Sequence, residues 1–382
     1  MRVVLLSVVA GCTFSTATPL VIDDPLIDAS LIDVMTTTID SCTTFSTQLN
    51  TCILPTNGNM PLTLTGNNTY NTENHTLTKS GQTIPVAYAT VSTSTGTIDV
   101  IYVSSFSLAA GATLRAIGPL PFAIAASGTV EIAGTISLVG PAAGSRTDAI
   151  CLASTGTKGA NSNQGAGGGG GGAFQGDGGD GSNGNSDGTQ NAGGPGGTKI
   201  AARPTGIMGG CDGGNGGEAQ GNGPVAGDGG GAILIAAGGS ITISGTGVIN
   251  VGGGAGQKGN GSNRGGSGGG SGGMILLESA QVTVQGVLAA NGGGGGEGNT
   301  SGEDGEDGQP SATPADGGTG GDSNGGNGGD GAAAAALAGE DTNDVRTGGG
   351  GGGGGGAGFI AVNCPAPVVT GAKISPAFGV WP

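Results

Sequence analysis

Aromatic and charged side chains are scarce in this chain. Phe, Trp and Tyr make up 3% of the 382 residues, and Asp, Glu, Lys and Arg make up 10%. This composition excludes a large conventional domain with an aromatic-rich core beneath a charged surface. The sequence has a single histidine, His75, and no cysteine pair with C-x₂-C spacing. A zinc site is therefore not expected.

Basic residues are fewer still. The chain has 11 Lys and Arg against 27 Asp and Glu, for a net charge of −16. Because no run of Lys or Arg could follow a phosphate backbone, nucleic-acid binding is not expected. The acidic excess is expected to keep a glycine-rich, weakly polar surface soluble.

The first apolar run, Val3 to Val9, is far too short for the roughly 20 residues of a membrane-spanning helix. Residues 1–12, MRVVLLSVVAGC, instead have a basic start, an apolar middle and a small-residue end, which is the signal-peptide pattern. Their ending resembles the bacterial lipobox, whose cysteine, here Cys12, is lipidated and becomes the new N-terminus. We expect export to the bacterial outer membrane or cell surface, with the membrane as a partner through this anchor. Without lipidation, secretion is expected.

The remaining cysteines fit an oxidising compartment. Nine residues separate Cys42 from Cys52, which makes this pair a candidate for a small disulfide loop. Cys151 and Cys211 flank the first glycine-rich tract and are candidates for a second disulfide that would limit the freedom of a long loop. Cys364 is then left over.

Glycine is abundant and unevenly distributed. It accounts for 92 of the 382 residues, about 24% against a usual share of roughly 7%. Only 11 glycines lie in residues 1–155, whereas 79 lie in residues 156–358. The collagen period is not sustained, since GEDGEDGQP (302–310) lapses after three triplets, so a triple helix is rejected.

Four similar segments recur between the glycine-rich tracts. They are FAIAASGTVEIAG (122–134), AILIAAGGSITISG (232–245), MILLESAQVTVQG (274–286) and FIAVNCPAPVVTG (359–371). Alternation such as Ile241-Thr242-Ile243-Ser244 puts apolar residues on one face of a strand. Since one strand cannot bury that face alone, the copies are expected to stack. We predict an all-β fold of the parallel β-helix or β-solenoid type. An antiparallel sandwich or barrel is the alternative.

This pattern divides the chain into alternating β units and glycine-rich inserts. The inserts are either disordered or packed as polyglycine II, in which three-fold extended chains lie side by side because glycine has no Cβ. The predicted parts are the signal 1–12, a Thr/Asn-rich tether and N-terminal region 13–95, β units 96–140, 231–252, 273–292 and 358–382, and inserts 141–230, 253–272 and 293–357.

Stretches such as LAAGATLRAIG, GAGGGGGGAFQGDGGDG, GGCDGGNGG and GGGAILIAAGGSITISGT occur in an order that resembles a known group. These are glycine-rich exported proteins of unknown function from myxobacteria and relatives. They are often labelled PGRS-like after the glycine-rich repeat region of mycobacterial surface proteins. The resemblance covers about residues 95–375 and implies no catalytic residues.

Motifs with chemical meaning elsewhere are weak here. Ser267 and Ser271 match the nucleophile elbow G-x-S-x-G, but a glycine tract precedes them and a strand follows, so a catalytic role is not expected. Asn183, Asn185 and Asp187 in NGNSDG resemble the first half of a calcium loop that lacks its closing glutamate. The acids of GEDGEDG could likewise hold a hard cation loosely, or simply be solvated.

Together these features predict a non-enzymatic structural or adhesive surface lipoprotein. Its expected partners are glycans, neighbouring cells or other copies of the chain, and no cofactor is expected unless calcium binds. Two alternatives stay open. One is a carbohydrate-active enzyme, which needs Glu131 or Glu278 to meet a second carboxylate. The other is a calcium-dependent surface binding module.

Overall fold

A computed structural model of the chain describes residues 44–54, 60–145, 149–186, 188–218, 223–321, 323–343 and 345–381. The regular structure of these residues is β-strand, apart from two short 3₁₀ helices, η2 (Thr51–Ile53) and η4 (Ala149–Cys151). In this part of the chain no helix has the length and apolar character needed to cross a membrane. Cys12, Cys42 and Asp187 lie outside the described residues.

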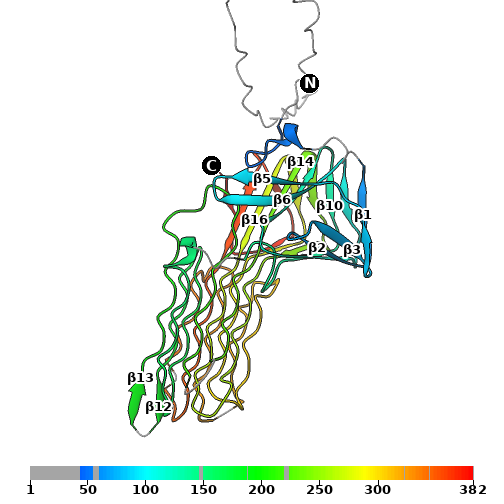
Figure 1. The fold of residues 1–382 in the computed structure, drawn as a ribbon. Helices are drawn as coiled ribbons and strands as arrows, with labels where there is room; N and C mark the ends of the chain where they lie inside the picture. The colour runs from blue at the N-terminus through cyan, green and yellow to red at the C-terminus, as the bar shows by residue number, and fades with distance from the viewer. Residues whose placement is uncertain are drawn as a thin grey trace, which may run out of the picture.

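Two large sheets form the upper part of the molecule (Figure 1). The eleven-stranded sheet contains β1 (Leu62–Leu64), β5 (Tyr88–Thr93), β6 (Gly96–Val103), β7 (Phe106–Leu108), β9 (Phe122–Ala126), β10 (Val130–Ile132), β14 (Ala232–Ile243), β16 (Met274–Val284), β18 (Phe359–Asn363), β19 (Val368–Val369) and β21 (Gly379–Val380). The eight-stranded sheet contains β2 (Asn67–Asn71), β3 (Thr76–Lys79), β4 (Gln82–Ile84), β8 (Thr113–Ile117), β11 (Thr135–Ser137), β15 (Val248–Asn250), β17 (Val287–Ala289) and β20 (Lys373–Ser375). A small hairpin pairs β12 (Gly184–Ser186) with β13 (Thr189–Asn191).

The four repeated segments lie side by side in the eleven-stranded sheet. Ile233 of β14 pairs in parallel with Phe122 of β9 and with Ile275 of β16, and Ile275 pairs in turn with Ile360 of β18. After its glycine corner each segment enters the other sheet, where β11, β15, β17 and β20 also pair in parallel.

The predicted parallel β-helix is nevertheless wrong. A solenoid needs each turn to continue into the next through a short corner, whereas here the chain leaves the sheets between successive units for long glycine-rich excursions. The result is two mixed, largely parallel sheets with a curled, half-barrel shape. Antiparallel pairs add strands to each sheet, namely β2–β3–β4 in the eight-stranded sheet and β5–β6 in the eleven-stranded sheet. An antiparallel sandwich is excluded as well, because the pairings between units are parallel.

Both faces of the eleven-stranded sheet are buried along β9, β18 and the first halves of β14 and β16. Ile233, Ile235 and Ile275 face the eight-stranded sheet and pack with residues such as Leu288. The alternate residues, such as Leu234, face a second apolar cluster that includes Trp381 and the N-terminal Leu49 and Leu54. Burial on both faces explains the uninterrupted apolar runs at the starts of β14 and β16.

The glycine-rich inserts leave the sheets together and form one elongated body, which we call the glycine bundle (residues 154–186, 188–200, 209–218, 223–231, 251–273, 290–321, 323–343 and 345–358; Figure 1). Its extended segments bond to one another with a period of three. Gly167, Gly170 and Ala173, for example, donate backbone hydrogen bonds to Ala160, Thr157 and Ser154. This period is that of three-fold polyglycine II or polyproline II helices, in which successive residues point to three different neighbours.

The segment 166–173 shows how the interior of the bundle is built. Its N–H groups donate to three neighbouring segments and its carbonyls accept from three others, so it is surrounded by six chains. The donors' partners lie in 154–160, 179–182 and 263–269, and the acceptors' partners in 194–197, 214–217 and 350–356. Such hexagonal packing needs glycine, because a Cβ on Gly171 would lie 1.9 Å from the carbonyl oxygen of Gly354.

Candidate functional site

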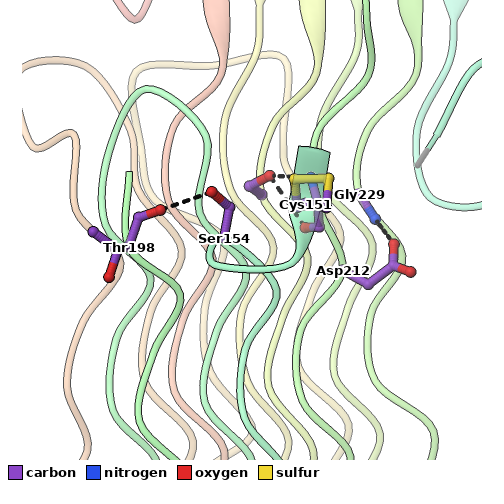
Figure 2. The surroundings of a disulfide bond; sticks show 7 residues. Cys151, Ser154, Thr198, Asp212 and Gly229 are labelled. Atoms are coloured by element: carbon purple, nitrogen blue, oxygen red, sulfur yellow. Dashed lines mark hydrogen bonds between the residues drawn. A yellow bond between two sulfur atoms is a disulfide. The ribbon is translucent and has the colours of Figure 1, made fainter. Parts of the chain in front are cut away.

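A disulfide bond closes the sheet-side end of the bundle. Cys151 in η4 is joined to Cys211, with 5.5 Å between their Cα atoms, and both residues are fully buried (Figure 2). Cys52 is also disulfide-bonded, whereas its predicted partner Cys42 lies outside the described residues. Cys364 is a free, buried thiol.

Acidic and amide side chains follow the edges of the bundle at three-residue steps. Asp177, Asp180 and Asn183 accept hydrogen bonds from the backbone N–H groups of Lys199, Gly196 and Gly193, at 2.7 to 2.9 Å. Other edges repeat this ladder. There Asp212 accepts from Gly229 (Figure 2), Asn215 from Ala226, Asp304 from Lys258 and Asp307 from Ala255. An edge N–H group has no neighbouring chain to receive it, so a side-chain oxygen does so instead.

The candidate calcium ligands are spread over this architecture. Asn183 belongs to the ladder, and its Nδ2 donates to Gln190. Asn185 lies in the β12–β13 hairpin, where its buried Oδ1 has no hydrogen-bond partner. Asp187 lies outside the described residues, among which no three His, Cys, Asp or Glu side chains gather as a metal site would require. The acids Asp304 and Asp307 of GEDGEDG also serve the ladder.

Burial perturbs one acid of the ladder. It raises the pKa of Asp212 to about 6, although the hydrogen bond from Gly229 opposes the shift, and the carboxylate of Asp228 adds to it. Burial likewise raises the pKa of Asp228. Burial of both acids and the repulsion of Asp228 on Asp212 mean that this part of the bundle disfavours negative charge.

The two candidate nucleophiles are structural. Ser267 and Ser271 are fully buried inside the bundle. The Ser267 hydroxyl donates to the carbonyl oxygen of Val225 at 2.6 Å, and the Ser271 hydroxyl accepts from the backbone N–H of Cys211 at 2.8 Å. Each hydroxyl therefore satisfies a backbone hydrogen-bonding group of a neighbouring chain.

The two glutamates of the repeated strands differ in environment. Glu131 is exposed on β10. Glu278 is fully buried on β16, where its carboxylate accepts hydrogen bonds from the hydroxyls of Ser46 and Thr47, the Thr47 N–H and the Asn363 amide. These partners are neutral, so Glu278 holds the N-terminal segment to the sheet instead of pairing with a second acid.

A polar cluster that the sequence pattern did not indicate lies at the N-terminal edge. The fully buried Asp99 of β6 binds the Tyr70 hydroxyl at 2.9 Å and His75 Nδ1 at 3.0 Å. The His75 ring stacks on Tyr88 with centroids 4.4 Å apart. Burial raises the pKa of Asp99, whereas the hydrogen bonds from His75 and Tyr70 lower it. The cluster ties β2, the β2–β3 turn, β5 and β6 together.

A cavity of about 260 Å³ lies at the bundle apex, the end farthest from the sheets. The turns that contain Asn263, Thr300, Asn324 and Thr347 meet there. Together with Asn299, Ser262 and Ser301, they line the cavity with amide and hydroxyl groups, and none of these lining residues is charged.

The apex turns are held in fixed positions. Asn299 is 5% exposed and Asn263 is partly buried, and both adopt the left-handed backbone conformation, with φ of 68° and 60°. Asparagine tolerates this conformation better than most residues. The Asn299 Oδ1 accepts from Gly349 N–H at 3.0 Å, and the Thr347 hydroxyl donates to Asn324 Oδ1 at 3.1 Å.

Two further cavities have different characters. One of about 270 Å³ lies on the flank of the bundle between Asp180, Pro195 and Asn343. Another of about 490 Å³ lies beside the sheets and is mainly apolar, with Met60, Pro85 and Tyr102 among its lining residues.

Comparison with protein-family models, curated proteins and solved structures finds no match to this chain. The apex cavity therefore rests on its own geometry. Its residues are spread over about 85 positions of sequence, from Ser262 to Thr347. The sequence signal for this cavity is the recurrence of Asn, Ser and Thr at the ends of the glycine runs.

Proposed function

We propose that the protein is a non-enzymatic surface module in which the sheets hold a glycine bundle that presents its apex to the surroundings. The role is structural or adhesive. The observation that carries this proposal is the bundle itself, in which interior chains such as 166–173 are hydrogen-bonded to six neighbours. A rigid scaffold with loops at its tip is the usual arrangement of a recognition surface.

The bundle is long enough to project well beyond the sheets. From Gly165 to Phe174 the chain advances about 28 Å at roughly 3.1 Å per residue. Its interior contains almost no side chains, and its edges carry Asp, Asn, Ser and Thr. Such a body has little apolar surface with which to aggregate, which suits exposure outside the cell.

The direction of the molecule supports display at a surface. The described N-terminal segment, with η2 in blue, lies at the sheet end, whereas the bundle apex lies at the other end (Figure 1). Glu278 fixes this segment through Ser46 and Thr47. With a lipid anchor at Cys12, the apex would point away from the membrane.

The expected partners follow from this surface, namely glycans, neighbouring cells or other copies of the chain. The resemblance to glycine-rich exported proteins of myxobacteria and relatives fits the same location. Neither alternative function gains support from the described contacts, since Glu278 is occupied by neutral groups and Asn183 by the backbone of Gly193.

A thiol placed at the apex tests the display. Intact cells expressing Thr300→Cys are treated with a membrane-impermeant maleimide. The wild-type chain is the matched control, because the free cysteine among its described residues, Cys364, is buried. We expect labelling of Thr300→Cys without lysis, and its release into the medium when Cys12→Ala is added. Labelling only after the cells are opened would contradict the proposal.

A further inference from the structure

We propose that the apex cavity binds the terminal residue of a neutral saccharide, an inference that deepens the proposed adhesive function and rests on it. The cavity is formed by residues of separate turns, Ser262–Asn263, Asn299–Ser301, Asn324 and Thr347. Each described lining residue carries an amide or a hydroxyl group, and none carries a charge or a large apolar surface. Saccharide hydroxyls both donate and accept hydrogen bonds, and amide side chains match them with one donor group and one acceptor group.

The position of Asn299 makes the cavity selective for such a ligand. Its Oδ1 is occupied by Gly349 N–H, and its backbone N–H by the carbonyl of Arg264. The Nδ2 group is in none of the hydrogen bonds found for the described residues, so it is available to a ligand. Because Asn299 is nearly buried, its rotamer is fixed before binding, which lowers the entropy that the complex loses.

The volume and the charge of the apex narrow the class of ligand. A cavity of about 260 Å³ is smaller than a typical site for a drug-sized ligand, so it suits one sugar residue at a chain end. The exposed acids Glu303 and Asp304 follow the cavity residue Ser301, and the chain carries a net charge of −16. Acidic sugars are therefore disfavoured.

The two arginines near the apex do not reverse this preference. The Arg264 guanidinium donates to Asn260 Oδ1 at 2.8 Å, and that of Arg346 donates to the Ser323 carbonyl oxygen at 3.3 Å. Arg264 therefore braces its own turn, and Arg346 links two apex turns. No aromatic ring lines the described cavity on which a sugar could stack, so single-site affinity should be weak, with Kd of about 1 mM. Many copies on one surface would raise the avidity.

The test is a titration of the purified full-length protein followed by NMR or calorimetry. The probes are N-acetylglucosamine, methyl α-mannoside and methyl β-galactoside as neutral sugars, and sialyllactose as the acidic counterpart. We expect at least one neutral probe to bind with Kd of about 1 mM, and sialyllactose to bind at least about tenfold more weakly. Failure of every neutral probe at about 20 mM, or equal binding of sialyllactose, would overturn the inference.

Two isosteric variants locate the site. Asn299→Asp keeps the oxygen that receives Gly349 N–H but replaces the Nδ2 donor, and should weaken binding of the neutral probe about tenfold. Asn343→Asp makes the same chemical change in the flank cavity and should alter Kd less than about twofold. Equal losses in both variants would refute the assignment to the apex, and unchanged melting temperatures check that both fold. Because the assay uses protein in solution, its outcome is separate from that of the thiol-labelling test on cells.

Discussion

At the scale of single residues, several acids along the edges of the bundle bind the backbone. Along the edges of the bundle, Asp and Asn side chains accept hydrogen bonds from backbone N–H groups. In the interior, the same groups donate to the carbonyl oxygens of a neighbouring chain. The ladder of Asp177, Asp180 and Asn183 advances three residues at a time, in step with the chain that it caps. The excess of acidic residues thus arises partly because backbone N–H groups at the edges of the bundle need side-chain acceptors.

Asp212 gives a pH-dependent test of this role. Its pKa is raised to about 6 in the folded chain, against about 3.9 when unfolded, so ionisation is disfavoured by folding. Asp212 therefore makes its full contribution to the free energy of unfolding below about pH 4, and this contribution is lost as the pH rises through about 6. Asp212→Asn keeps an oxygen for Gly229 N–H and removes the charge. We expect it to raise the unfolding free energy by about 1 kcal/mol at pH 7, after allowance for solvent screening, and to have little effect at pH 4.

Urea unfolding of the wild type and the variant at the two pH values measures this difference. Asp307→Asn is the control, because its carboxylate receives Ala255 N–H at an exposed edge. It should change the unfolding free energy by less than about 0.5 kcal/mol at either pH. A loss of stability in Asp212→Asn at pH 7 would mean that the charge, and not only the acceptor, is needed.

At the scale of elements, the number of glycines in each group of three residues indicates whether a chain lies in the interior or at an edge of the bundle. Residues 348–356 are all glycine and lie in the interior, where neighbouring chains contact every side. Residues 302–308, GEDGEDG, have glycine only at every third position and lie at an edge. Their Glu and Asp side chains reach solvent, while Gly305 and Gly308 approach residues 256 and 253. The short collagen-like period of residues 302–308 therefore reflects their position at one edge of the glycine bundle.

A pair of identical substitutions tests this steric requirement. Gly171→Ala would place its Cβ 1.9 Å from the carbonyl oxygen of Gly354, so two chains must separate. We expect it to lower the unfolding free energy by about 3 kcal/mol or more. Gly245→Ala, at a corner of the β14 unit, has nothing within 4 Å of its Cβ and should change stability by less than about 0.5 kcal/mol. Chemical denaturation followed by circular dichroism measures both, and similar losses would contradict the lattice explanation.

The sequence indicated some elements well and others not at all. The alternation in Ile241–Ser244 and the copies of one segment were enough to predict strands that stack beside one another, and β14, β16 and β18 do pair in parallel, with one register shift between Ala237 and Ser240. The overall arrangement was not predictable in this way, because strand pattern does not tell where the chain travels between β11 and β14. The apex cavity was hidden for the same reason. Its residues meet only through contacts between chains, such as Asn299 with Gly349.

At the scale of the whole molecule, sheet and bundle are continuous. Gly231 and Gly273 end bundle segments, and the next residues begin β14 and β16. Hydrogen bonds between neighbouring chains also continue from the bundle into the sheet, since Gly273 N–H donates to the Val251 carbonyl and Met274 N–H to the Gly231 carbonyl. Neither part can therefore separate its chains without disturbing the other.

This continuity predicts a single cooperative unfolding transition. Trp381, the only tryptophan, is buried in the apolar cluster on the sheets with Arg203 over its ring, so its fluorescence reports on the sheets. A dye on Thr300→Cys reports on the bundle apex. In urea, we expect the two signals to change at the same midpoint, because segments such as 263–273 lead directly into strands of the sheet. Gly171→Ala should shift both midpoints together. A bundle signal lost at lower urea than the tryptophan signal would show instead that the bundle is a separate folding unit hung from a self-sufficient pair of sheets.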